Sequence, residues 1–160
     1  MAETRAKPVL VDPVWDRITA EAEAAVDREP LMGGLIHSCV LHHHSLEKAL
    51  SYRIAAKLSS NEMSMLVLRE VADEAYAADQ SLAEAARADL MAVLERDPAT
   101  HRLLQPILYF KGFQAMQAYR VSHRLWRDGR KDLAYFLQMR ASEVYGIDIH
   151  PGAAIGKGIM

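Results

Sequence analysis

The apolar residues of this chain recur every three or four positions from about residue 13 to residue 144, which is the spacing of one face of an α-helix. In the segment that begins at Pro13, for example, Trp15, Ile18 and Ala22 fall on a single face. The same period predicts further helices over the ranges 31–41, 45–58, 63–78, 81–93, 106–129 and 133–144. We therefore expect a mainly α fold, a multi-helix domain without a long linker or an internal repeat in its helical part.

Polar residues and glycines mark the ends of these helices. Asp12 followed by Pro13 predicts an N-cap with proline at the first helical position. Ser45 can cap the helix that follows it, and the stretch Ser81-Leu82-Ala83-Glu84 has the form of a capping box. Gly146 is placed as the C′ residue of the last helix, so we expect helical structure to end there.

The period changes after residue 146. Ile149 and Ile155 are six residues apart, and each is followed by small, turn-forming residues. Six-residue periods build parallel β-helices, whose coils bury their apolar faces by stacking on one another. We therefore divide the chain into a helical domain, 1–146, and the start of a β-helix, 147–160. Because two hexapeptides cannot bury their own faces, we expect residues 147–160 to be poorly ordered or held by neighbouring molecules.

The composition is that of an ordinary globular protein, with 51% hydrophobic and 25% charged residues. A formal net charge of −2 gives no reason to expect nucleic acid or an anionic membrane surface as a partner. No apolar run approaches the ~20 residues that a membrane span needs. Cys39 is the only cysteine, which excludes an intrachain disulfide and favours a reducing cytoplasm.

Three consecutive histidines, His42, His43 and His44, are the first candidates for a metal site. Consecutive helical residues point about 100° apart, so the three cannot converge on one ion from a single helix. Histidines near a helix C-terminus, where a positive charge is favourable, account for the pattern better. We therefore expect no metal site at these residues.

Two aspartates are candidate functional residues. Asp97 precedes Pro98, a pair typical of a cap or turn, although a carboxylate at such a junction could also bind a substrate ammonium. Asp148 and His150 alternate along an extended segment, so both could line one surface as an acid–base pair. The spacing alone favours the alternative, a pair of solvated residues at an edge.

One helical face carries Tyr119, His123 and Trp126, which we interpret as part of the core with a hydrogen-bonded histidine. The sequence contains no Gly-rich phosphate loop, nucleophile elbow or multi-cysteine zinc site. The residues by themselves therefore point to no single reaction.

Three segments nevertheless resemble one family when they are taken in order. They are ERDPA at 95–99, LLQPILYFKGFQAMQAYRVSHRLW at 103–126 and IDIHPGAAIGKGIM at 147–160. Together they resemble serine O-acetyltransferase, the enzyme that starts cysteine synthesis in bacteria and plants. The resemblance covers essentially the whole chain, and the patterns KGFQA-x-QAYR and DIHP-x-A-x-IG-x-GIM make it specific.

The resemblance implies an all-helical N-terminal domain followed by a left-handed parallel β-helix, of which this chain would hold only the first turn. It also implies a dimer of trimers, with β-helices forming each trimer and helices joining the two. In the active site, a histidine in a D-H pair just after the GIM segment would take the serine proton, and the hydroxyl would attack acetyl-CoA directly. Asp97 matches the serine-binding aspartate, and Asp148 matches the aspartate that pairs with this catalytic histidine.

The resemblance also sets expectations about what lies beyond Met160. The chain would stop before the catalytic histidine, the CoA-binding coils and the C-terminal tail that docks onto O-acetylserine sulfhydrylase. We therefore expect these 160 residues to be inactive alone and to form a helix-mediated dimer. The parent would use L-serine and acetyl-CoA in the cytoplasm, with no metal and no permanently bound cofactor. Two alternatives stay open, namely a non-catalytic helical assembly module and a hexapeptide acyltransferase with another acceptor.

Overall fold

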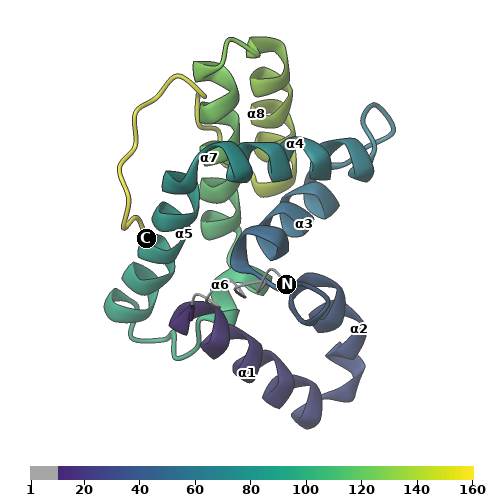
Figure 1. Ribbon diagram of the computed structural model, residues 1–160, viewed down its shortest axis with the longest axis vertical. Coiled ribbons are helices and arrows are strands. Elements are labelled where there is room, and N and C mark those ends of the chain that lie inside the picture. Colours follow the sequence, from purple (N-terminus) through teal and green to yellow (C-terminus); the bar gives the residue numbers. More distant parts are fainter. Residues whose placement is uncertain (1–10) are drawn as a thin grey trace, which may run out of the picture.

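The computed structural model describes residues 11–160 (Figure 1). Three short helical pieces follow the first α-helix, and a series of longer α-helices makes up the rest. In order, the elements are α1 (Pro13–Arg28), the 3₁₀ turn η1 (Pro30–Met32), α2 (Gly33–Ile36), the π-helix η2 (His37–Leu41), α3 (Leu46–Leu58), α4 (Met65–Ala78), α5 (Gln80–Arg96), α6 (Leu104–Tyr109), α7 (Lys111–Arg127) and α8 (Lys131–Tyr145).

The mainly α fold is confirmed, since residues 11–160 contain helices and turns but no β-strand. Three predicted helix ends are also confirmed. The Asp12 carboxylate accepts a hydrogen bond from the Trp15 N–H at 3.2 Å, and Ser45 Oγ accepts one from the Lys48 N–H at 3.3 Å. At the other end, Gly146 follows α8 with φ of +69°, the left-handed conformation that glycine adopts without strain.

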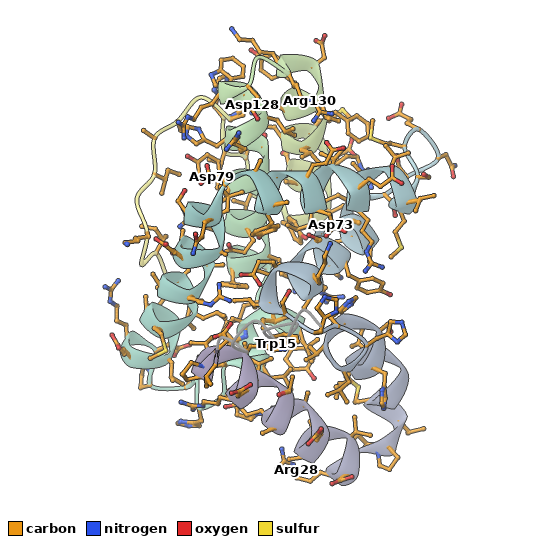
Figure 2. All side chains as sticks on the ribbon, in the orientation of Figure 1. Trp15, Arg28, Asp73, Asp79, Asp128 and Arg130 are labelled. Carbon is orange, nitrogen blue, oxygen red and sulfur yellow. The ribbon has the colours of Figure 1, made fainter. Side chains whose placement is uncertain are left out.

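The predicted capping box at Ser81 is wrong. Helix α5 begins at Gln80, and its N-cap is Asp79, whose Oδ1 accepts hydrogen bonds from both the N–H and the hydroxyl of Ser81. Figure 2 shows Asp79 at the corner where α4 ends and α5 begins. An aspartate two residues before the serine satisfies the first-turn N–H, so the serine hydroxyl becomes a donor to the cap instead of the cap itself.

The single helix predicted over 106–129 is also wrong, because it is two helices. Helix α6 begins at Leu104 and ends before Phe110, whose extended backbone interrupts the helix, and α7 starts at the next residue. The buried side chain of Gln114 donates a hydrogen bond from Nε2 to the Ile107 carbonyl oxygen at 2.9 Å. This bond satisfies a carbonyl that the broken helix would otherwise leave without a partner.

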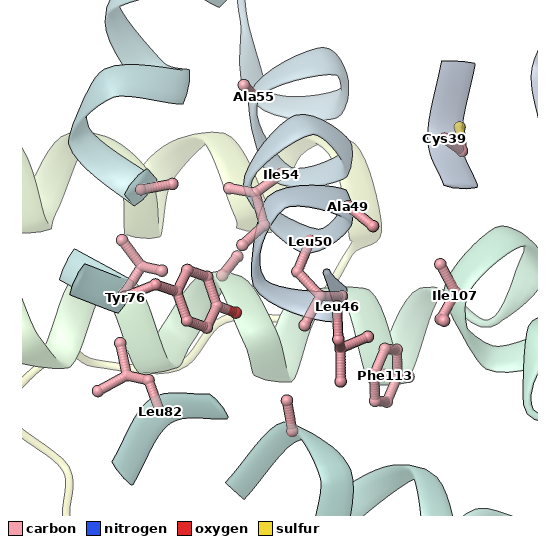
Figure 3. Packing of buried hydrophobic residues seen from close by; sticks show 14 of the residues in the cluster. Cys39, Leu46, Ala49, Leu50, Ile54, Ala55, Tyr76, Leu82, Ile107 and Phe113 are labelled. Atoms are coloured by element: carbon pink, nitrogen blue, oxygen red, sulfur yellow. The ribbon is translucent and has the colours of Figure 1, made fainter. Parts of the chain in front are cut away.

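The core joins helices that are distant in the sequence. Helices α3 and α4 pack against each other, as do α7 and α8, and α3 also contacts the second pair. Figure 3 shows Leu46 and Leu50 of α3 beside Phe113 of α7, with Tyr76 of α4 on the other side. All four side chains are buried. In Figure 1, α1 and α2 lie at one end of the molecule and the turn between α7 and α8 lies at the other.

Residues 147–160, hereafter the C-terminal segment, leave α8 without regular structure. Turns at 151–152 and bends at 157–158 recur six residues apart, which matches the predicted hexapeptide period. The segment runs beside α7 and α5, drawn in yellow in Figure 1. The Ile155 N–H donates to the Tyr119 hydroxyl at 3.2 Å, and that hydroxyl donates to the Ala153 carbonyl oxygen.

The expectation that this segment is poorly ordered or held by neighbouring molecules stays a prediction, but it left out one source of support for the segment. Its own chain holds it through hydrogen bonds to the backbone, whereas the expectation considered only the burial of its apolar side chains. The division into domains 1–146 and 147–160 stays a prediction. In the described part of the chain, no helix combines the length and the apolar character that crossing a bilayer requires.

Candidate functional site

Asp97 ends helix α5 and lies partly exposed in the turn that follows. Its Oδ1 accepts a hydrogen bond from the Ala99 N–H at 2.9 Å, and its Oδ2 accepts one from the Thr100 hydroxyl at 2.7 Å. The bond from Thr100, followed by the one from the Ala99 N–H, lowers the pKa of the Asp97 carboxyl below its ordinary value of 3.8. The local contacts are those of a turn carboxylate, and the group is ionised at neutral pH.

The same carboxylate borders a cavity of about 330 Å³, hereafter the Asp97 cavity. Its walls come from the end of α5, the break between α6 and α7, and both ends of the C-terminal segment. The lining residues are Val93, Asp97, Phe110, Gly112, Phe113, Met116, Ile147, Ile149, Ile159 and Met160. Among these described residues, only Asp97 has a charged side chain, so the cavity presents one side-chain anion among apolar side chains.

Asp148 does not line this cavity, although both of its neighbours do. Side chains alternate along an extended backbone, so Ile147 and Ile149 face the cavity while Asp148 faces away from it. Asp148 is exposed, and its Oδ1 accepts a hydrogen bond from Gln138 Nε2 of α8 at 2.7 Å. The segment that carries Asp148 therefore lies beside Asp97, but the two carboxylates do not share one cavity.

The proposed pairing of Asp148 with His150 is absent from the described residues. His150 Nδ1 instead accepts a hydrogen bond from the Gly152 N–H at 3.0 Å. Its ring packs edge-on against Trp126 of α7 at 5.1 Å between centroids and against Tyr135 of α8 at 5.8 Å. Both residues are exposed, as in the alternative interpretation of solvated residues at an edge.

The helical face with Tyr119, His123 and Trp126 is more than a part of the core. Tyr119 exchanges hydrogen bonds with the backbone of the C-terminal segment, and Trp126 contacts His150. His123 Nδ1 lies 2.7 Å from the Pro151 carbonyl oxygen, which requires the proton on that nitrogen. The histidine is hydrogen-bonded as expected, and the face as a whole is where the C-terminal segment binds.

The consecutive histidines lie where η2 ends, in agreement with the interpretation of residues near a helix C-terminus. His43 is buried, its Nε2 lies 2.9 Å from the Ser38 carbonyl oxygen, and its ring lies 5.2 Å from that of Tyr52. Burial lowers the pKa of His43 below 6.5, which favours the neutral ring. His42 and His44 are exposed, and residues 11–160 contain no group of three or more His, Cys, Asp or Glu side chains arranged to hold a metal.

A buried charged cluster that the sequence analysis did not identify lies beside the candidate site. Asp89 of α5 is fully buried and forms a two-point ion pair with Arg120 of α7, with distances of 2.7 to 2.9 Å. Gln117 Nε2 donates to the same carboxylate at 2.9 Å. Gln117 and Arg120 are three residues apart in α7, so they share a helical face, and this is the signal that could have indicated an acidic partner.

The comparisons with known proteins agree with this geometry. Residues 14–118 match the family described as "Serine acetyltransferase, N-terminal". The chain belongs to the serine acetyltransferase family. It is 49% identical over 147 residues to the serine acetyltransferase of Escherichia coli K12, covering 92% of this chain and 54% of that protein. The family suggested by the sequence motifs is thus confirmed.

Solved structures of family members have the same fold. A Neisseria gonorrhoeae serine acetyltransferase in complex with serine is 44% identical, with a TM-score of 0.91, covering 97% of this chain and 64% of that one. A Brucella abortus serine acetyltransferase in complex with coenzyme A is 42% identical, with a TM-score of 0.89, covering 92% of this chain and 59% of that one. The chain spans about half the length of the curated relatives that it matches.

Proposed function

We propose that these residues form the N-terminal part of a serine O-acetyltransferase. The enzyme transfers the acetyl group of acetyl-CoA to the hydroxyl of L-serine, which gives O-acetylserine and CoA in the first step of cysteine biosynthesis. Membership of the family supports this reaction, as do the serine and coenzyme A complexes of the two related structures. Acetyl-CoA acts as a co-substrate, and the enzyme uses no permanently bound cofactor.

The observation that carries the proposal is the position of Asp97 in one cavity with Ile159 and Met160. The resemblance places the catalytic D-H pair directly after the GIM segment, so the serine-binding carboxylate lies beside the place where that pair would follow. An ionised carboxylate at the edge of an apolar cavity suits the ammonium group of an amino acid, because a charge-assisted hydrogen bond is stronger where water is scarce. Each Asp97 oxygen accepts only one hydrogen bond within the described chain, which leaves lone pairs for a substrate.

Asp148 has the second role, as the partner of the catalytic histidine. Gln138 binds its Oδ1, which fixes the orientation of the carboxylate, and in residues 11–160 its Oδ2 has no hydrogen-bond partner. An oxygen of this kind can accept the N–H of an imidazole and stabilise the imidazolium that forms when the serine proton is taken. Asp148 is exposed, so this oxygen is accessible to such a partner.

The assembly proposals rest on the family resemblance and on exposed apolar side chains. Leu31 is 93% exposed and Leu66 is 68% exposed, which suits a contact between helical domains. We propose a helix-mediated dimer for these residues and a dimer of trimers, in which the β-helices form each trimer, for the enzyme. O-acetylserine sulfhydrylase is the proposed partner, bound through a C-terminal tail of the enzyme, and the cytoplasm is the proposed location.

A chimera tests the reaction. Residues 1–160 are joined to the remaining residues of the Escherichia coli enzyme, and thiol release from acetyl-CoA is followed with L-serine, with other hydroxyl-bearing acceptors and without an acceptor. We expect turnover that depends on serine. Turnover with a different acceptor would support the alternative of another hexapeptide acyltransferase. A folded chimera that turns over no acceptor would leave the helical assembly module as the function of these residues.

A further inference from the structure

The buried carboxylate of Asp89 binds the C-terminal segment as well as the helices. Its Oδ1 accepts hydrogen bonds from the backbone N–H groups of Gly158 at 2.8 Å and Ile159 at 2.9 Å. Arg120, which pairs with this carboxylate, also donates from Nη2 to the Gly156 carbonyl oxygen at 3.0 Å. One buried charge pair thus joins α5, α7 and the last residues of the chain.

The backbone at Gly158 has the shape that such a carboxylate requires. Its φ of +76° lies in the left-handed region, and the two consecutive N–H groups point at one oxygen. An ideal Cβ at Gly158 would meet no atom within 4 Å, so the glycine is needed for its backbone conformation and not for space. Arg96 Nη1 binds the Gly158 carbonyl oxygen at 3.0 Å and holds the same turn from its other side.

A role in the stability of the helices alone does not account for this arrangement. Replacing a buried ion pair with apolar side chains of similar size is often neutral or stabilising, so two helices could pack without charges here. What an apolar pair could not do is accept hydrogen bonds from the N–H groups of Gly158 and Ile159, which would then lose the acceptor that fixes their direction. The distinctive contribution of Asp89 is therefore its hold on the C-terminal segment.

We propose that Asp89 is a positioning residue that fixes the turn at Gly158 and thereby sets Ile159 and Met160 as one wall of the Asp97 cavity. Asp89 itself does not line that cavity, and it acts through the backbone of the two residues that do. That Asp89 binds the C-terminal segment follows from these hydrogen bonds alone. Its effect on serine binding rests on the proposed function.

Hydrogen exchange of individual amides in the 160-residue chain, measured by NMR, tests the hold. The variant is Asp89→Leu combined with Arg120→Met, which removes the acceptor without leaving a single buried charge. Hydrogen bonds to charged groups predict that the Gly158 and Ile159 amides exchange about 10- to 100-fold faster, while those in the middle of α3 change little. The control combines Glu74→Gln with Arg130→Gln, an exposed ion pair away from the segment. Unchanged exchange at both amides, or no protection of them in the unaltered chain, would overturn the proposal.

A glycine variant tests the same turn by changing its backbone conformation instead of the carboxylate. Gly158→Ala keeps Asp89 intact but strains the left-handed backbone, and we expect roughly 5- to 30-fold faster exchange of the Ile159 amide. Gly34→Ala is the matched control, because Gly34 lies in α2 with φ outside the left-handed region and nothing within 4 Å of an added Cβ. Equal effects of the two alanine substitutions on that amide would contradict a turn built around Asp89.

Kinetics of the chimera test the consequence for serine. The doubly substituted cluster should raise the KM for serine about tenfold or more while leaving the KM for acetyl-CoA within about twofold, since only the Asp97 cavity loses a wall. Faster amide exchange without this change in KM would refute the link to serine binding. An inactive unaltered chimera would instead count against the proposed function, while the exchange measurements would still decide the hold on the segment.

Discussion

Replacing Asp97 with asparagine separates its charge from its local contacts. The side chains have the same shape, and both local hydrogen bonds can survive. The remaining amide oxygen can accept from the Ala99 N–H, and the amide nitrogen can donate to the Thr100 hydroxyl in place of accepting from it. The variant therefore loses the negative charge that borders the cavity and little else.

The expected size of the effect follows from this separation. A hydrogen bond to a charged group contributes about 1.5–3 kcal/mol, so losing it at the substrate ammonium should raise the KM for serine about 10- to 100-fold. The turn is partly exposed and keeps its bonds, so the free energy of unfolding should change by less than about 0.5 kcal/mol. For a domain of this size, that change corresponds to a shift in Tm of less than about 2 °C.

Steady-state kinetics of the chimera and thermal unfolding of the 160-residue chain give the two numbers. Asp128→Asn is the control, because it removes one carboxylate at the turn between α7 and α8 that does not line the cavity. A KM for serine within twofold of the unaltered chimera would refute the substrate role of Asp97. If the variant instead lowered only Tm, Asp97 would be a turn residue and nothing more.

Four further outcomes are expected. Residues 1–160 alone should show no serine-dependent thiol release, since the resemblance places the catalytic histidine in a part of the relatives that this chain does not cover; measurable turnover would make His150 a candidate base. In the chimera, Asp148→Asn should lower kcat about 10²- to 10⁴-fold with little change in Tm, and an unchanged kcat would exclude its pairing role. Light scattering coupled to size exclusion should give a dimeric mass for residues 1–160, whereas a trimer would show that the C-terminal segment dominates assembly. Ser81→Ala should raise the pKa of Asp79 in an NMR titration, because the Ser81 hydroxyl is the largest cause of its lowering. The stabilisation that this hydrogen bond gives is present above pH 3.8 and is lost as pH falls through the folded pKa. The free energies of unfolding of the variant and the unaltered chain should therefore become equal in acid.

The features that could be predicted from the sequence depend on residues close together in the chain. Asp12 caps α1 by accepting from the Trp15 N–H, and Ser45 caps α3 by accepting from the Lys48 N–H, each three positions along the chain. Gly146 ends α8 through its own left-handed φ. The error at the capping box arose where two local signals compete. Both Asp79 and Ser81 can cap a helix, and the aspartate does so because it stands at the corner that ends α4 as well.

The motifs predicted which residues to consider for the candidate site, but not how their side chains are arranged. ERDPA and DIHP identified Asp97 and Asp148 through the resemblance, but they gave no information about which side chains meet. The cavity beside Asp97 needs Ile147 and Ile149 from one end of the C-terminal segment and Ile159 from the other. No periodicity in the sequence specifies how a segment without regular structure folds back on a helix.

Asp89 shows why the rest of the site could not be predicted in this way. Its side-chain partners are 28 and 31 residues away, and its backbone partners are 69 and 70 residues away. A six-residue period suggests apolar faces that only further coils can cover, yet the last turn of this segment is bound through its backbone N–H groups by one buried carboxylate. Gly158 is one of the small, turn-forming residues that follow Ile155, and its left-handed φ turns two N–H groups toward that carboxylate. A glycine in a hexapeptide therefore indicates a turn, but what the turn binds is decided by a charge on a distant helix.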